Sequence, residues 1–199
     1  KVREANGTVR APEFTVNQAA TGSQCVSAVI ALQDGGFAVT WQNFDTTTTV
    51  SAIAFDEDGN VTMAQQDMPG TDGLGTSPDI TQLTTGELVI SYTAARPDPM
   101  QGNDAVVAVI SNYATAPAVS QYQITNEPGV NQADVAVTAL PGGGFTAAFF
   151  QDGDLLIQSY TAPGIAMAGS FVAIPGGGAT VGGGNDLRPS IHTLNDGKV

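Results

Sequence analysis

Four stretches of this sequence repeat one pattern: Leu32-Gln-Asp-Gly-Gly-Phe37, Leu83-Thr-Thr-Gly-Glu-Leu88, Leu140-Pro-Gly-Gly-Gly-Phe145 and Leu194-Asn-Asp-Gly-Lys-Val199. Each stretch is a leucine followed by a glycine-containing turn and the start of a strand. The leucines are 51, 57 and 54 residues apart. A period near ~50 residues is typical of a repeat architecture rather than of one irregular domain.

The strand after each turn alternates bulky and small side chains. In the first copy, Phe37, Val39 and Trp41 alternate with Ala38 and Thr40. A period of two predicts a β-strand with different side chains on its two faces, as expected where sheets stack on sheets. Each period holds three more strand-like segments. The last segment of each period is polar and irregular, around residues 14–16, 65–68, 122–124 and 171–174, and is predicted to be an edge strand.

Four antiparallel strands in ~50 residues is the size of a β-propeller blade. We therefore predict an all-β protein, a β-propeller-like array of four-stranded antiparallel blades. The alternative is a row of tandem β-sandwich modules, although one such module needs ~7 strands and about 100 residues.

The repeats divide the chain approximately into residues 13–64, 65–120, 121–169 and an incomplete 170–199, with residues 1–12 as the end of a preceding repeat. Residues 1–7 align with the end of a third strand at 53–59, and residues 194–199 stop as a second strand begins. We expect one repeat region that belongs to a larger chain, with other domains of that chain among its partners.

Composition limits the partners of this protein. Six basic residues against nineteen acidic ones give a formal net charge of −13, which would repel nucleic acid and anionic membrane surfaces. We expect no nucleic-acid partner. We also expect no membrane insertion, because no apolar run approaches the ~18 residues that span a bilayer.

The single cysteine, Cys25, cannot form an internal disulfide and is predicted to be a small buried hydrophobic residue in a strand.

Three stretches of the first repeat carry a family resemblance: residues 14–24, which begin Phe-Thr-Val-Asn, residues 29–41, which contain Leu32-Gln-Asp-Gly-Gly-Phe37, and Ala54-Phe-Asp-Glu-Asp-Gly-Asn60. They resemble the tandem repeats of large secreted bacterial RTX-type and cadherin-like surface proteins. The later copies depart from this pattern, with Tyr92 and Phe149 in place of Trp41. The resemblance implies an extracellular or cell-surface adhesin or exoprotein whose export signal lies outside this chain.

Little in the sequence points to catalysis. His192 is the only histidine and is predicted to be a strand residue rather than a catalyst. No catalytic constellation is recognised, so we expect no enzyme activity, although two carboxylates alone could serve a glycosidase. No cofactor is predicted apart from calcium, for which Asp56, Asp58 and Asn60 provide alternating oxygen donors around Gly59. A plain hairpin turn is the alternative interpretation of these residues.

These observations predict a non-enzymatic extracellular repeat module for adhesion, surface assembly or spacing. The alternative is a carbohydrate-binding (lectin) or carbohydrate-active propeller domain that uses carboxylates on its loops. A glycan or a cell-surface protein is the expected external partner. The longest variable loop, residues 94–104, contains Arg96 and Met100, which are candidates for contact with either one. The alternative, favoured by its prolines, is an inert surface loop.

Overall fold

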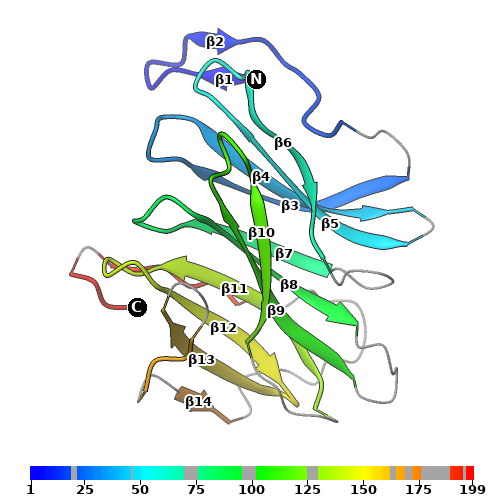
Figure 1. Cartoon of the computed structure of the whole chain (residues 1–199), viewed down its shortest axis with the longest axis vertical. Coiled ribbons are helices and arrows are strands. Elements are labelled where there is room, and N and C mark those ends of the chain that lie inside the picture. Colours follow the sequence, from blue (N-terminus) through cyan, green and yellow to red (C-terminus); the bar gives the residue numbers. More distant parts are fainter. Residues whose placement is uncertain are drawn as a thin grey trace.

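The computed structural model describes residues 1–18, 22–45, 47–69, 76–95, 102–124, 130–161, 165–168, 172–175, 189–194 and 196–199. In these residues all regular structure is β, in three four-stranded antiparallel sheets and one two-stranded sheet. Figure 1 shows the sheets in chain order, from β1 and β2 at the top to β11–β14 at the bottom. The predicted all-β, propeller-like fold is confirmed.

Each four-stranded sheet consists of four successive strands paired in chain order, as in a propeller blade. The predicted repeat boundaries 64/65 and 120/121 fall inside the fourth strands of the first and second sheets. The strands are β1 (Val2–Arg3) and β2 (Val9–Ala11); β3 (Ser23–Ala31), β4 (Phe37–Phe44), β5 (Thr48–Phe55) and β6 (Val61–Asp67); β7 (Thr76–Gln82), β8 (Leu88–Ala95), β9 (Asn103–Ser111) and β10 (Ala118–Gln123); and β11 (Gln132–Ala139), β12 (Phe145–Gln151), β13 (Asp154–Tyr160) and β14 (Val172–Ile174).

The leucine-to-glycine motif forms the same turn in all four copies. The leucine N–H donates to the carbonyl four residues later, at 2.9, 2.8, 2.8 and 2.7 Å for Leu32, Leu83, Leu140 and Leu194. The third residue after each leucine is a glycine with positive φ, between 79° and 103°. Glycine adopts this left-handed conformation without steric cost, so the repeated motif specifies where each hairpin turns.

The middle sheet is buried on both of its faces. On one face, Leu88, Ile90 and Tyr92 pack in a cluster with small residues of β5, including Ala52 and Ala54. On the other face, small residues of β9 pack in a second cluster with residues of β12: Ala105, Val107 and Val109 with Phe145, Ala147 and Phe149. A sheet that is covered on both faces is incompatible with separate two-sheet sandwich modules.

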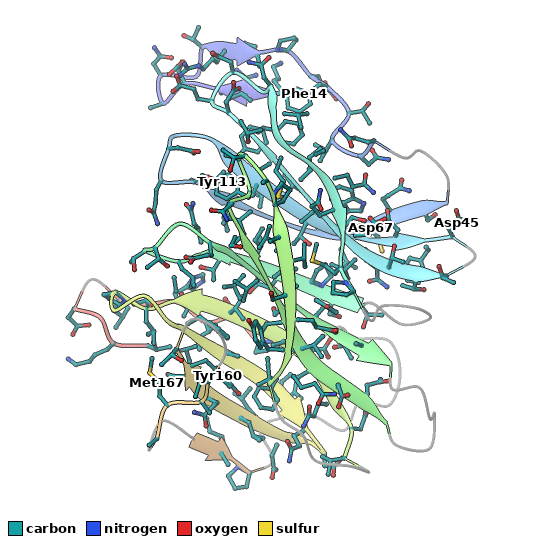
Figure 2. The ribbon with its side chains drawn as sticks, in the orientation of Figure 1. Phe14, Asp45, Asp67, Tyr113, Tyr160 and Met167 are labelled. Atoms are coloured by element: carbon teal, nitrogen blue, oxygen red, sulfur yellow. The ribbon has the colours of Figure 1, made fainter. Side chains whose placement is uncertain are left out.

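Two buried tyrosines add directional contacts to this stacking. The Tyr92 hydroxyl donates to the carbonyl of Pro69 at 2.7 Å, and the Tyr160 hydroxyl donates to the carbonyl of Ile124 at 3.0 Å. Both carbonyls follow the fourth strand of the preceding sheet, and Tyr160 is labelled in Figure 2. Burial raises the pKa of both phenols, so the hydroxyls remain protonated donors.

Two local predictions were wrong. Cys25 is exposed rather than buried, because β3 is the edge strand of its sheet and its first three residues, Ser23 to Cys25, are all exposed. Residues 14–16 form no strand. The strand nearest to this stretch is β2 of the two-stranded N-terminal sheet. Phe14 instead packs on Phe55, with ring centroids 5.2 Å apart. No helix in the described part of the chain has the length and apolarity to cross a membrane.

Gly144 gives a direct test of the turn geometry. A Cβ at this position would lie 2.2 Å from the Tyr160 carbonyl oxygen, whereas one at Gly142 would meet nothing within 4 Å. We expect Gly144→Ala to lower the free energy of unfolding by about 2–3 kcal/mol in urea titrations, because backbone must shift to relieve the clash. Gly142→Ala is the matched control and should change it far less. Equal effects of the two changes would contradict the described turn.

Candidate functional site

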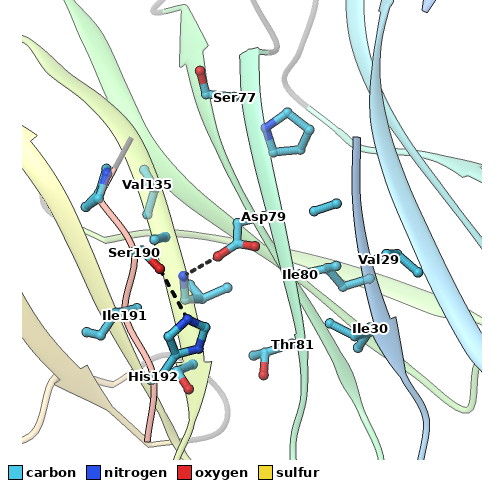
Figure 3. Close-up of a pocket in the computed structure, with 16 residues that line it drawn as sticks. Val29, Ile30, Ser77, Asp79, Ile80, Thr81, Val135, Ser190, Ile191 and His192 are labelled. Carbon is cyan, nitrogen blue, oxygen red and sulfur yellow. Dashed lines mark hydrogen bonds between the residues drawn. The ribbon is translucent and has the colours of Figure 1, made fainter. Parts of the chain in front are cut away.

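A cavity of about 300 Å³ lies where the inner strands, the first strands of successive sheets, come together. Its walls come from β3, β7, β11 and residues 189–192 (Figure 3). These four stretches occupy equivalent places in the repeat. The residues three positions before the four repeat leucines, Val29, Ile80, Val137 and Ile191, all line the cavity.

A bulge marks each inner strand at the same repeat position. Val26, Ser77 and Asp134 stand six residues before their leucines and have φ of 55°, 55° and 54°. The register with the neighbouring strand shifts at each of these positions. A left-handed conformation costs a non-glycine residue about 1–2 kcal/mol, so its recurrence indicates a geometry that the blade requires. Bulges redirect side chains, and Ser77 of β7 thereby lines the cavity.

Side chains join the inner strands across the cavity wall. An Asp79 carboxylate oxygen accepts the Val137 N–H at 2.9 Å, and the Thr81 hydroxyl oxygen accepts the Ala139 N–H at 3.2 Å. One repeat later, the Thr193 N–H donates to the Thr138 hydroxyl at 3.2 Å. Because β7 and β11 belong to different sheets and residues 189–194 form no strand, side chains supply the links that backbone pairing supplies within a sheet. The wall is thereby held together by polar groups.

Ser190 and His192 form a polar pair on the segment 189–194. The Ser190 hydroxyl lies 3.2 Å from Nε2 of His192, and both side chains are exposed. Figure 3 shows this pair opposite Asp79 and Ile80 of β7. The prediction that His192 is a strand residue was wrong, because residues 189–194 form no strand, and its place in the cavity was missed. The repeat alignment held the signal, since residues 191 and 192 match Ile80 and Thr81.

The cavity lining combines aliphatic side chains with hydroxyls, one imidazole and one carboxylate. Within the described residues that form its walls, Asp79 is the sole acidic group, and neither arginine nor lysine is present. With a net charge of −13 on the whole chain, the electrostatic potential of this cavity disfavours anions. Its chemistry suits a neutral molecule with several hydrogen-bonding groups.

The predicted calcium residues lie together in the turn between β5 and β6, and the structure shows their hydrogen bonds. One Asp56 carboxylate oxygen accepts the N–H groups of Asp58 at 2.9 Å and Asn60 at 2.8 Å. The other accepts the Asn60 side-chain amide at 2.9 Å. An Asp58 oxygen accepts from Nε of Arg10 at 2.8 Å. These contacts account for the three residues as a hairpin turn fastened to β2.

Calcium binding by Asp56, Asp58 and Asn60 stays a prediction. No group of three or more histidine, cysteine, aspartate or glutamate side chains suited to a metal ion occurs among the residues with a described placement. In the long variable loop, residues 96–101 lie outside the described residues, and so does the expected contact surface at Arg96 and Met100.

Comparison with known proteins gives little further information. No protein-family model matches the chain, and no curated protein matches it. One similar solved structure is the intramolecular trans-sialidase from Ruminococcus gnavus in complex with oseltamivir carboxylate, at 12% sequence identity and a TM-score of 0.45. The match covers 71% of this chain and 33% of the trans-sialidase chain. This chain thus spans about a third of that protein's length.

The Asp56 turn predicts a specific acid titration. Hydrogen bonds from the Asn60 side chain and then from the Asn60 and Asp58 backbone hold the Asp56 pKa below its ordinary value of 3.8. A lowered pKa stabilises the fold above the ordinary value, and this contribution is lost as the pH falls through the folded-state pKa. Carboxyl NMR should show Asp56 titrating below 3.8, and Asn60→Ala should raise that pKa. A value at or above the ordinary one would contradict the described turn.

Proposed function

We propose that this region is a non-catalytic carbohydrate-binding propeller module whose ligand occupies the cavity between the inner strands. The observation that carries this proposal is the cavity itself, with a volume of about 300 Å³ and four repeat-equivalent stretches in its wall. That volume is at the lower end of the ~300–1,000 Å³ range of small-molecule sites. A monosaccharide or a terminal sugar of a glycan suits it best.

The polar groups of the wall support a neutral sugar. Ser190, His192 and Thr138 present hydroxyl or imidazole groups beside aliphatic residues such as Ile80 and Ile191. Sugar hydroxyls both donate and accept hydrogen bonds, as serine and threonine hydroxyls do. An acidic sugar would meet Asp79 without a compensating cation from the described wall. We therefore expect neutral glycans to bind in preference to sialylated ones.

The number of acidic side chains in the cavity wall supports binding without hydrolysis of the sugar. Glycosidases use two acidic side chains about 5–9.5 Å apart on either side of the scissile bond. In the described wall Asp79 stands alone as an acid, and one of its oxygens accepts the Val137 N–H at 2.9 Å. The second acid that hydrolysis needs is therefore missing from the described part of the cavity.

An extracellular setting is part of the same proposal. The acidic composition and the resemblance of residues 14–60 to RTX-type repeats support it, and surface glycans are found there as ligands. The adhesion, assembly or spacing role predicted from the sequence stays a prediction, because stacked blades serve a spacer and a lectin equally well.

The proposal is tested by a glycan array followed by calorimetric titration of the best ligand. Ser190→Ala and His192→Ala should each weaken binding by roughly 3- to 10-fold, since each removes about one hydrogen bond from the site. Ser120→Ala, at an exposed position of β10, is the matched control and should leave the affinity unchanged. Failure of every neutral glycan to bind, equal affinities for wild type and cavity variants, or glycan hydrolysis would each overturn the proposal.

A further inference from the structure

The sequence contains two acceptor motifs for N-linked glycans, which read Asn-x-Thr with x other than proline. They are Asn6-Gly-Thr8 and Asn60-Val-Thr62. An acidic residue, Glu4 or Asp58, stands two positions before each asparagine. Because the two motifs are so alike in sequence, any difference in their modification has to come from the structure around them.

Both motifs lie at hairpin turns of the same backbone geometry. Gly7 has φ of 86° in the turn between β1 and β2, and Gly59 has φ of 84° in the turn between β5 and β6. The Gly7 N–H donates to the Glu4 carbonyl at 2.8 Å, and the Gly59 N–H donates to the Asp56 carbonyl at 3.1 Å. Figure 1 shows the β1–β2 hairpin at the top of the array. The turns are therefore alike, and the surroundings of the side chains distinguish the motifs.

The first motif is open to solvent over its whole length. Residues 3–10 are all exposed. The side-chain oxygen of Asn6 accepts the Thr8 N–H at 2.9 Å. The amide nitrogen of Asn6, the atom to which a glycan is attached, makes no hydrogen bond within the part of the chain that the structure describes. A transferase can thus reach Asn6 and Thr8 without displacing another part of the fold.

The second motif is held by the fold at both of its reactive groups. The amide nitrogen of Asn60 donates to an Asp56 carboxylate oxygen at 2.9 Å. The hydroxyl oxygen of Thr62 is buried. Val61 and Thr62 belong to β6, in which Val61 pairs with Phe55 of β5. Use of this motif therefore requires a strand of a four-stranded sheet to open.

The two segments also differ in how easily they open. β1 and β2 form a two-stranded sheet that is paired at two positions, Val2 with Ala11 and Arg3 with Val9, and such hairpins are marginally stable by themselves. β6 carries Met63, which is 1% exposed in the core. Local opening is easiest where few contacts are buried. The segment around Asn6 can therefore enter the acceptor groove of an enzyme while the sheets stay folded.

We propose that Asn6 is an N-glycan acceptor and that Asn60 is not modified in the folded protein. In the transfer, the Asn6 amide nitrogen bonds to the anomeric carbon of a lipid diphosphate-linked oligosaccharide. The bond from that carbon to the diphosphate oxygen breaks, the nitrogen loses one proton, and the lipid diphosphate leaves, so nothing is oxidised or reduced. The proposal rests on the extracellular setting proposed above, because this modification belongs to secreted proteins.

Transfer to the purified, folded protein by a single-subunit oligosaccharyltransferase, with its lipid diphosphate-linked oligosaccharide, tests the proposal. We expect a glycan at Asn6 at a rate at least roughly tenfold above that at Asn60, because local opening limits access to β6. Intact mass counts the glycans, and peptide mapping with the glycan still attached locates them, so deamidation of Asn6 is not counted. Unfolded peptides of residues 2–10 and 56–64 are the controls, and both should be modified.

Variants test whether the motif itself is read. Asn6→Gln and Thr8→Val should abolish the modification, Thr8→Ser should retain it, and Asn60→Gln is the matched control that should leave it unchanged. No glycan on the folded protein, equal rates at Asn6 and Asn60, or a glycan on the Thr8→Val variant would each overturn the proposal. None of residues 1–11 lines the cavity between the inner strands, so the outcome is independent of the test of carbohydrate binding.

Discussion

The fold depends on the stacking of bulky side chains of one sheet against small side chains of the sheet before it. A single four-stranded sheet of this chain has two apolar faces and cannot bury both alone. The middle sheet does so because its Ile90 and Tyr92 face β5 of the first sheet, while Val107 and Val109 of β9 face the third. Each sheet therefore contributes one bulky and one small face.

This stacking also creates the cavity. Sheets that pack face to face bring their first strands together at one edge, where backbone pairing between them is absent and side chains such as Asp79 and Thr81 form the links. The bulges at Ser77 and Asp134 recur at that edge. The candidate ligand site is thus a consequence of how the blades meet, and every repeat contributes the same positions to it.

The sequence was sufficient to predict the repeat, the turns and the sheet faces. Leucine-to-glycine spacing marked the hairpins, and the alternation of Phe37, Val39 and Trp41 with small residues marked the stacked faces. The exposure of Cys25 could not be predicted in this way, because the alternation of side chains along a strand does not tell whether another part of the chain covers that strand. The place of His192 in the cavity was missed because a lone histidine shows no motif. An alignment of residues 191 and 192 with Ile80 and Thr81 of β7 would have predicted its place beside the other inner strands.

The rates of native-state amide hydrogen exchange test the central claim most directly. This claim is that the middle sheet is the most stable one because it is covered on both faces. Amides of β8 and β9 should exchange slowest, while those of β3, where Val29 is 65% exposed, should exchange much faster, because local opening follows burial. Slowest exchange in β3 and β4, or uniform protection across all three sheets, would show that stacking does not organise the fold.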